Sequence, residues 1–380
     1  MKLIAVFTKT VREMRRDILV VLLTVLSAAL FIGLYKIITF GGTTAYRLIV
    51  CDETRSNALV PLIEKLRAST YVNGSPMLKV SVLSNRAEAE AILTDGKADA
   101  ALAVPASFAD DVARVRTGSA PSVNVHIIGN LSNPYYSVCI IVASTILEPY
   151  IASLTGRTPL ITFNEKALGT SSQKSEFDMY VPGIFVLSVI MLLFIVAMTV
   201  ARDYETGALK RLRLTRASAF DILGGITLAM LLLAAVSILA TMGTAFALGF
   251  HASGPLWAVF LIGLLTAFSI IGAGLIIGCF SRTPLEAFVI ANFPFILLMF
   301  FSGSIFPIPR LELFTVFGRT IALFDILPPT HAVSALTKVV TFGCGFNDIV
   351  YELAALTVLS LVYFIIGVAS YKRMRLSATV

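Results

Sequence analysis

The 380-residue sequence has few charged residues, few cysteines and few histidines, and each shortage excludes a class of protein. Charged residues make up 14% of the chain and hydrophobic residues 57%, whereas a soluble domain carries roughly 25% charged and about 45–50% apolar residues. The four cysteines and three histidines show no spacing typical of a metal site. The sequence therefore predicts an integral membrane protein and no metal centre.

Several functional motifs are also absent. Without a GxxxxGK[ST] phosphate loop the chain cannot hydrolyse ATP by that chemistry, so we expect no cofactor in this chain. The sequence contains no GxSxG or HExxH motif and nothing that resembles a nucleic-acid-binding module. Charged residues are nearly absent from the apolar segments, which argues against a proton-coupled carrier and against an ion channel. Any energy for transport must then come from another protein.

Long uncharged segments predict six transmembrane helices, because a helix needs about 20 apolar residues to cross the ~30 Å hydrocarbon layer. The run 222–281 is too long for one helix and breaks at Gly249–Pro255. We expect a polytopic α-helical membrane protein with an α/β domain between its first two spans. The expected segments are a cytoplasmic interfacial amphipathic helix at 1–17, spans at 18–40, 179–201, 221–249, 256–281, 285–306 and 349–371, an extracytoplasmic domain at 41–178, a cytoplasmic helix at 202–220, an extracytoplasmic re-entrant or amphipathic segment at 307–348 and a cytoplasmic tail at 372–380.

Lys and Arg are concentrated in the connections that six spans place on one side of the membrane. The positive-inside rule assigns that side to the cytoplasm, so both termini should lie inside a cell membrane. The opposite turn at 249–255 has no Lys or Arg. The basic residues on the expected inner side are Lys2, Lys9, Arg12, Arg15, Arg16, Arg202, Lys210, Arg211, Arg213, Arg216, Arg282, Lys372, Arg373 and Arg375.

Two segments allow a second interpretation. The first apolar run could be a cleaved signal peptide, although its length favours an uncleaved span. The segment 134–154 could be a seventh span, but an odd number of crossings would place the basic segment 202–216 outside. We interpret 134–154 as a long amphipathic helix, and leave open whether it touches the membrane.

The segment 41–178 alternates between strand and helix patterns, which predicts a small α/β domain. Strands are expected at 46–52, 77–83, 98–105 and 122–128, and helices at 57–69, 85–96 and 107–116. Residues 169–177 are typical of a flexible tether. Cys51 and Cys139 would share this domain, either as a disulfide or as two small buried side chains.

The charged segment "RDYETGALKRLRLTR" (202–216) lies between two long uncharged stretches of the chain. Its leucines and basic residues fit a short amphipathic helix at the cytoplasmic surface, and Gly207 allows a sharp elbow after the second span. A basic loop on anionic headgroups is the simpler alternative. That alternative leaves Asp203 and Glu205 without a role, so a binding groove on a partner protein explains the segment better.

This segment resembles the signature that follows the second span in membrane subunits of type-2 ATP-binding-cassette exporters. Ala208, Lys210 and Arg216 depart from that signature. "FFSGSIFPIP" (300–309) and "LPPTHAVSAL" (327–336) are similar to two further family segments, and the order of one span, an outer domain and five more spans also matches. The residues that match the signature in place are Arg202, Asp203, Glu205, Gly207, Leu209, Leu212 and Thr215.

The resemblance implies that 202–220 is a coupling helix seated in a separate cytoplasmic ATPase, braced by the amino-terminal helix. It also implies a second permease subunit, identical or a sister chain, and two ATPases that bind ATP and Mg. Membrane lipid is a further expected partner, and an envelope adaptor is left open. The residues assigned to coupling are Arg202, Asp203, Tyr204, Glu205, Thr206, Gly207, Leu209, Leu212 and Thr215.

Two helix faces are candidates for a substrate path, with ordinary helix packing as the alternative. The resemblance implies that the second and fifth spans flank such a path. Its Met and Phe residues would suit a hydrophobic or amphipathic cargo moved outward. A different function, a membrane sensor whose outer domain binds a ligand, is also compatible with the topology. The candidate path residues are Leu187, Met191, Phe194 and Met198 on the second span and Phe288, Asn292, Phe295 and Met299 on the fifth.

Overall fold

A computed structural model describes the chain in two compact units. One unit comprises Met1–Phe40 and Ala167–Val380, and the other comprises Gly41–Lys166. The first is called the membrane unit below and the second the α/β unit. The residues described are 2–38, 45–54, 59–71, 74–119, 122–130, 133–156, 176–208, 217–305, 311–316 and 319–376.

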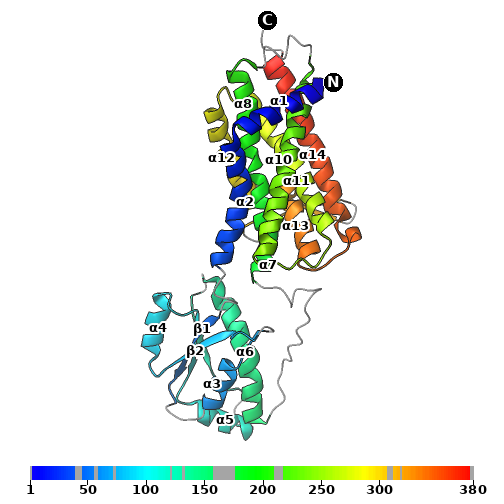
Figure 1. The fold of residues 1–380 in the computed structure, drawn as a ribbon. Coiled ribbons are helices and arrows are strands. Elements are labelled where there is room, and N and C mark those ends of the chain that lie inside the picture. The colour runs from blue at the N-terminus through cyan, green and yellow to red at the C-terminus, as the bar shows by residue number, and fades with distance from the viewer. Residues whose placement is uncertain are drawn as a thin grey trace. The chain divides into compact units, whose positions relative to one another are not determined.

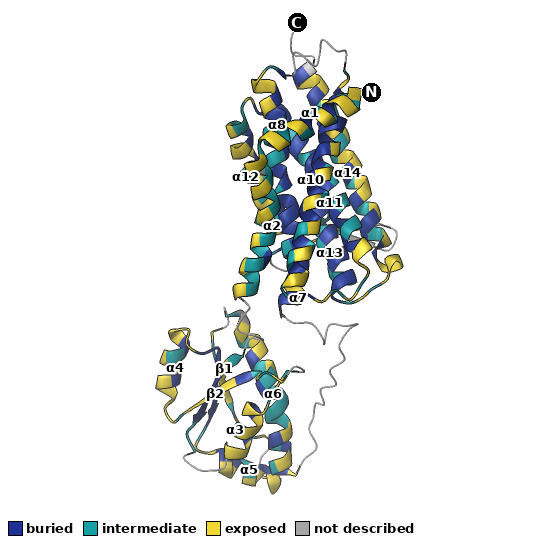
Figure 2. Ribbon diagram, in the orientation of Figure 1, coloured by how far each residue is buried: buried dark blue, intermediate teal, exposed yellow. Residues whose placement is uncertain are grey.

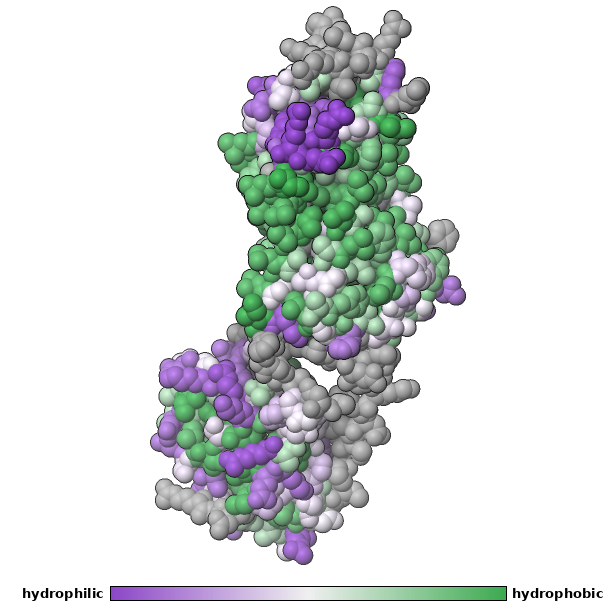
Figure 3. All heavy atoms as spheres, in the orientation of Figure 1, coloured by the Kyte–Doolittle hydropathy of each residue, from purple (hydrophilic) through white to green (hydrophobic). Residues whose placement is uncertain are grey.

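The membrane unit is a bundle of long apolar helices (Figure 1). Hydrophobic side chains cover the middle of its surface, and hydrophilic side chains gather at the end where α1 lies (Figure 3). The chain is therefore a polytopic helical membrane protein. Its helices are α1 (Lys2–Arg16), α2 (Ile18–Ile38), α7 (Glu176–Ile190), α8 (Leu192–Glu205), α10 (Ala219–Ala247), α11 (Leu256–Phe280), α12 (Pro284–Phe301), α13 (Pro328–Val340) and α14 (Val350–Tyr371).

Among the described residues, six helices are long and apolar enough to cross a membrane, and one bent pair could add a seventh. Helix α6 (Pro134–Thr155) is among the six by length and composition. It nevertheless belongs to the α/β unit, where Cys139, Ala143 and Tyr150 share a core with strand residues such as Leu48 and Leu102. Helix α2, at 21 residues and thus about 31 Å, has the length of a span.

The second predicted span, expected at 179–201, is one candidate span with a break at a single residue. Helices α7 and α8 meet at Met191, and together they form one candidate span, Phe177–Glu205. The Phe194 amide donates to the Met191 carbonyl at 3.3 Å, a three-residue bond that tightens the turn. The break therefore falls on a residue that was predicted to line a substrate path.

Glycines allow α11 to pack closely on α8, and the GxxxG spacing of Gly274 and Gly278 is typical of such packing. A Cβ on Gly278 would lie 2.6 Å from the Val200 Cβ, and one on Gly274 would lie 2.8 Å from the Val196 Cβ. Real side chains do not tolerate such contacts, so only glycine fits at both positions. Buried residues follow α10 and α11, whereas α12 is largely exposed (Figure 2).

Helix α1 bends by 82° from the start of α2, the geometry expected of an interfacial helix that leads into a span. It packs on Gly225 of α10, where an added Cβ would lie 2.7 Å from the Val6 Cβ. The apolar residues Leu3, Ile4, Phe7 and Val11 share one face of a helix by their spacing, and Leu3, Phe7 and Val11 are half-buried. Ile4 is 64% exposed, and the buried residues of α1 are Val6 and Thr10.

The α/β unit has the strands and helices expected from the alternating pattern. Its sheet order is β2-β1-β3-β4, parallel except for β4. The last strand is shorter than expected, because only His126–Ile128 pairs with β3. The elements are β1 (Tyr46–Asp52), α3 (Val60–Arg67), β2 (Leu78–Leu83), α4 (Arg86–Thr94), β3 (Ala100–Val104), α5 (Phe108–Arg116), β4 (His126–Ile128) and α6 (Pro134–Thr155).

Cys51 and Cys139 are both buried and both free thiols. Burial, with a smaller effect of the Asp99 charge, raises the pKa of Cys139 to about 12, so this thiol stays protonated near neutral pH. The structure thus agrees with the second alternative, in which Cys51 and Cys139 are small buried side chains and not a disulfide.

The connection between the fifth and sixth spans contains more structure than the re-entrant or amphipathic segment expected at 307–348. Strands β5 (Glu312–Val316) and β6 (Arg319–Ala322) pair antiparallel, and neither strand was predicted from the sequence. Helix α13 follows and buries His331 and Leu336 on one face, so the segment does include an amphipathic helix. Most of the tether expected at 169–177, namely residues 169–175, lies outside the described part of the chain. Its last two residues belong to α7, which begins at Glu176.

Candidate functional site

The charged signature begins inside helix α8, which runs without interruption from Leu192 to Glu205. Two residues after the helix, the Gly207 amide donates to the Tyr204 carbonyl at 3.1 Å. Gly207 has a φ of 67°, a left-handed conformation that side chains other than glycine's rarely adopt. This backbone geometry ends the helix and explains why glycine occupies the position, whereas the surface helix expected after it lies largely outside the described residues.

Two ion-pair groups connect the end of α8 to the amino-terminal helices. Arg202 pairs with Asp17, and Asp203 pairs with Lys9. The Lys9 ammonium also lies 3.1 Å from a Glu13 carboxylate oxygen. These contacts join segments nearly two hundred residues apart in sequence, and they give the acidic residue Asp203 a partner within the chain. The amino-terminal helix thus braces the end of α8.

The residues assigned to ATPase coupling differ in exposure. Tyr204, Glu205 and Thr206 are exposed, as is Arg202 despite its ion pair, and they form a surface that a partner can reach. Asp203 is only 5% exposed and points into the unit instead. Three further residues of this assignment, Leu209, Leu212 and Thr215, lie outside the described part of the chain.

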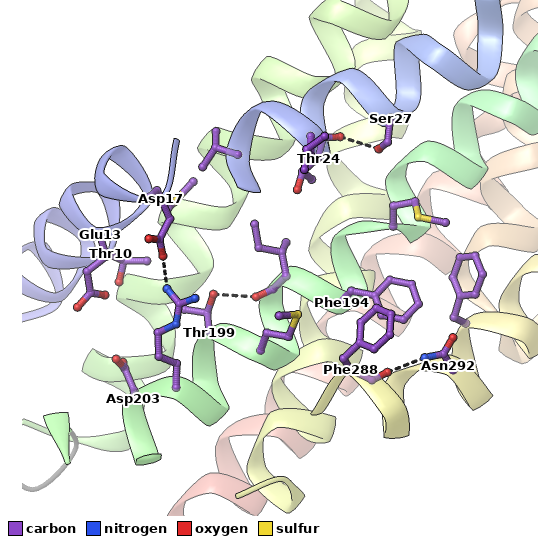
Figure 4. Close-up of a pocket in the computed structure, with 18 residues that line it drawn as sticks. Thr10, Glu13, Asp17, Thr24, Ser27, Phe194, Thr199, Asp203, Phe288 and Asn292 are labelled. Carbon is purple, nitrogen blue, oxygen red and sulfur yellow. Dashed lines mark hydrogen bonds and ion pairs between the residues drawn. The ribbon is translucent and has the colours of Figure 1, made fainter. Parts of the chain in front are cut away.

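A cavity of about 520 Å³ lies between the amino-terminal helices, α8 and α12 (Figure 4). Its size falls within the roughly 300–1,000 Å³ range of small-molecule sites. Charged residues line one end, and phenylalanine residues with Asn292 line the other. The lining comprises Thr10, Glu13, Met14, Asp17, Val21, Leu23, Thr24, Ser27, Met191, Phe194, Ile195, Met198, Thr199, Arg202, Asp203, Phe288, Asn292 and Phe295.

The cavity brings together residues from both helix faces proposed as a substrate path. Met191, at the start of α8, and Phe194 and Met198 within it line the cavity together with Phe288, Asn292 and Phe295 of α12. Two further candidates, Leu187 and Met299, are not part of the lining. Leu187 is buried in α7, on the other side of the break at Met191.

Aromatic contacts join the two walls of the cavity. The Phe194 ring lies 5.1 Å from the Phe288 ring and 5.0 Å from the Phe295 ring, measured between centroids. Tilted aromatic pairs at such distances attract beyond their burial. Phe194 therefore fixes α8 against α12 at the apolar end, so that a movement of α8 would alter this contact.

Arg375, close to the end of the described chain, contacts the same elbow and was missed from the sequence. Its guanidinium carbon lies 3.8 Å from the centre of the Tyr204 ring. Its Nη2 donates to the Gly278 carbonyl at 3.3 Å and to the Ser281 carbonyl, both at the carboxyl end of α11. A lone arginine in a basic tail carries no sequence signal for such a contact.

The two other segments that resemble family motifs pack at the ends of their helices. In the "SGS" turn after α12, the Ser302 and Ser304 hydroxyls hydrogen-bond each other at 2.7 Å, and Gly183 of α7 contacts the Ser304 backbone. In the second segment, His331 Nε2 lies 2.8 Å from the Asp325 carbonyl. Both segments thus have structural contacts, and 306–310 lies outside the described residues.

Comparison with known proteins gives two kinds of match. The chain is 24% identical over 328 residues to the probable multidrug ABC transporter permease YbhS of Escherichia coli strain K12, covering 80% of each protein, and the same holds for the protein of that name in Escherichia coli O157:H7. Residues 16–369 match the model of the ABC-2 family transporter protein, which spans nearly the whole chain, and the chain therefore belongs to the ABC-2 transporter family.

Proposed function

We propose that this permease subunit exports hydrophobic or amphipathic compounds, driven by ATP that a separate cytoplasmic ATPase hydrolyses. Membership of the family implies an ATPase partner and a dimeric assembly. The observation that carries the proposal is the course of α8. One end of this helix lines the cavity with Phe194 and Met198, and the other carries the exposed residues Tyr204 and Glu205.

Helix α8 is suited to transmit a movement, because a continuous helix connects the elbow to the cavity wall. A force on the elbow would shift the helix and change the contact of Phe194 with Phe288 and Phe295. In the proposed cycle, ATP and Mg bind the ATPases, the elbow moves, and the cavity opens outward. The sibling permease would supply the facing half of the path, whether it is a second copy or a sister chain.

The proposed orientation places α1, the end of α8 and the end of α14 in the cytoplasm. Ion pairs and the Arg375–Tyr204 contact bring these three segments together at one end of the membrane unit. Basic residues at that end, Arg12, Arg15 and Arg16 among them, favour the cytoplasmic side. The α/β unit would then lie outside the cell membrane.

The experiment is reconstitution of the chain with its ATPase in lipid vesicles, measuring ATP-dependent transport and ATP hydrolysis together. Gly207→Ala should impose strain on the elbow and uncouple hydrolysis from transport by roughly tenfold. Gly249→Ala is a matched control, since Gly249 also has a positive φ of 85° and open space around its Cβ, but lies between α10 and α11. Both variants should retain folded spans.

Two results would contradict the proposal. Equal transport by the Gly207→Ala and Gly249→Ala variants would remove the elbow from the mechanism. Purification of the chain with a kinase or regulator, in place of a stoichiometric ATPase, would instead support the sensor interpretation.

A further inference from the structure

The cavity has an acidic end whose charges do not balance. Three carboxylates, Glu13, Asp17 and Asp203, line it together with one guanidinium, that of Arg202. Lys9 adds a positive charge next to the lining, through its pairs with Glu13 and Asp203. One negative charge is thus left over. Figure 4 shows Thr10, Glu13, Asp17 and Asp203 at one side and Phe194 and Phe288 at the other.

Two buried atoms at this acidic end have no hydrogen-bond partner among the described residues. They are Asp203 Oδ2 and Thr10 Oγ1. Asp203 is 5% exposed and Thr10 is 1% exposed, and both residues line the cavity. A buried carboxylate oxygen without a donor is unfavourable, because water no longer solvates it. Both atoms can accept a hydrogen bond, so the ligand that satisfies them is a donor.

Three other polar side chains of the cavity differ, because each bonds to its own helix. Asn292 Nδ2 donates to the Phe288 carbonyl at 2.8 Å, and the Thr199 hydroxyl donates to the Ile195 carbonyl at 2.7 Å. The Ser27 hydroxyl donates to the Thr24 carbonyl at 2.9 Å. The unmet hydrogen-bonding capacity that the described residues show in this cavity is therefore confined to the acidic end.

We propose that the acidic end of the cavity, centred on Asp203 and Thr10, binds the ammonium group of an amphipathic primary amine. This inference rests on the proposed function and names the chemical class of its cargo. A primary ammonium carries several donors and one positive charge, which match two acceptors and one excess negative charge. The apolar part of the amine would lie along Met191, Phe194 and Phe295.

The same charges disfavour other amphiphiles. A fatty acid would bring a second carboxylate next to Glu13, Asp17 and Asp203. A phospholipid with an amine headgroup would bring its phosphate close to the same carboxylates. A neutral amide of the same shape would offer a donor but no charge. The cavity therefore selects a free amphipathic amine over these three.

The test is a binding measurement on the purified full chain in lipid nanodiscs near neutral pH, without the ATPase. The probe is dansylcadaverine, a fluorophore with a primary ammonium at the end of its chain. Its N-acetylated form is the neutral comparison, and a dansyl derivative with a carboxylate is the anionic one. Dansylcadaverine should bind about tenfold more tightly than the acetylated form, which corresponds to one charge-assisted hydrogen bond.

Two substitutions separate a binding role from a merely structural ion pair. Asp203→Asn should weaken dansylcadaverine binding about tenfold, because it removes the charge that pairs with the ammonium. Lys9→Met should strengthen binding, because Lys9 competes with the ligand for Asp203. If the pair served only to brace the helices, both substitutions would weaken binding.

Further variants keep the result decisive if Asp203→Asn fails to fold. Thr10→Val preserves the shape and the ion pair but removes one acceptor, and should weaken binding several-fold. Asp221→Asn is the control, because Asp221 takes part in the N-terminal cap of α10 with Ser218 and does not line the cavity. The affinity of this variant for dansylcadaverine should not change.

Equal affinity for dansylcadaverine and its acetylated form would overturn the proposal, and so would equal effects of Asp203→Asn and Lys9→Met in one direction. Because the binding assay contains no ATPase, its failure leaves the proposed export function testable separately. If the chain transported a neutral compound with ATP and showed no preference for the ammonium, the proposed cargo class would be wrong and the proposed export function would stand.

Discussion

The α/β unit and the membrane unit each contain a buried aspartate, and the two carboxylates differ in how many hydrogen bonds they accept. In the α/β unit, Asp99 is 3% exposed and accepts hydrogen bonds from the Arg47 amide at 2.8 Å, the Arg47 guanidinium and the Asn133 amide group. In the membrane unit, Asp203 pairs with Lys9 through one oxygen, while its other oxygen has no partner among the described residues.

This difference separates a structural carboxylate from a candidate binding group. The bonds of Asp99 join β1, the approach to β3 and the start of α6, and they use both of its oxygens. Such a group stabilises the fold, and a change there should affect folding. Asp203 retains an open acceptor beside a cavity, so a change there should affect binding more than folding. The predictions below test this distinction.

The largest effect should follow from Asp99→Asn. An amide cannot accept the same set of hydrogen bonds, and the Arg47 guanidinium loses its counter-charge, so the α/β unit should lose about 2 kcal/mol of stability. This value is lower than for a fully buried pair because the Arg47 side chain is 45% exposed. The measurement is amide hydrogen exchange in strands β1 and β3 of the full chain.

Asp95→Asn provides the control for this prediction. Asp95 pairs with Lys97 at 2.8 Å, but both side chains are well exposed, at 59% and 71%. Exposed pairs contribute little, so hydrogen exchange in the same strands should not change measurably. Equal effects of the two substitutions would mean that burial and hydrogen bonding do not set the role of Asp99.

Acid should reproduce part of the effect of Asp99→Asn. Burial raises the pKa of Asp99, but the hydrogen bonds from Arg47 and its positive charge together lower the pKa by more than burial raises it. The pKa of Asp99 in the folded chain therefore lies below its ordinary value of 3.8. A lowered pKa in the folded state means that the contribution of Asp99 is complete above pH 3.8 and is lost as the pH falls through the folded pKa.

Hydrogen exchange in β1 and β3, measured from neutral pH down to acidic pH and corrected for the intrinsic rate, should show this loss in the original chain. The Asp99→Asn variant should show a smaller dependence on pH in that range. Identical pH profiles for the two chains would show that other groups dominate the acid response of the unit.

The contrast between the two aspartates could not have been found in the sequence. Strand and helix patterns indicated most elements of the α/β unit, because a period of two or of 3.6 residues is a local property. The bonds of Asp99 to Arg47 and Asn133 depend on which strands become neighbours, and no local pattern encodes that. The spans and the GxxxG contact of Gly274 and Gly278 were likewise predictable from local composition and spacing.

The cavity was only half predictable. The helical spacing of Met191, Phe194 and Met198 placed them on one face, and the same reasoning grouped Phe288, Asn292 and Phe295. The amino-terminal wall was missed, because it depends on the 82° bend between α1 and α2 and on the seat that Gly225 provides. The "GG" at 224–225 was the available signal for that close approach.

Glu352 provides an intermediate case that sharpens the comparison. Its Oε1 lies 2.6 Å from the Lys338 ammonium, and its Oε2 has no partner among the described residues, as in Asp203. Unlike Asp203, it does not line the cavity between α8 and α12. Glu352→Gln should therefore lower the thermal stability of the chain by about 1 kcal/mol and leave dansylcadaverine affinity unchanged. A loss of affinity would show that an unpartnered oxygen anywhere in the unit influences binding.

The smallest effect should come from Thr10→Val, measured as thermal stability without ligand. The Thr10 hydroxyl is buried and has no partner among the described residues, so replacing it with a methyl group of similar shape should stabilise the empty chain by about 0.5 kcal/mol. Thr8→Val is the control on the same helix, since the exposed Thr8 hydroxyl already donates to the Ile4 carbonyl at 2.9 Å. A gain in stability that accompanies a loss of amine affinity is the expected signature of a binding group, because the buried hydroxyl is unfavourable in the empty chain and gains a hydrogen-bond partner only when the ligand binds. If Thr10→Val instead destabilised the empty chain, the hydroxyl would have a structural partner, and Asp203 and Thr10 would belong in the same class as Asp99.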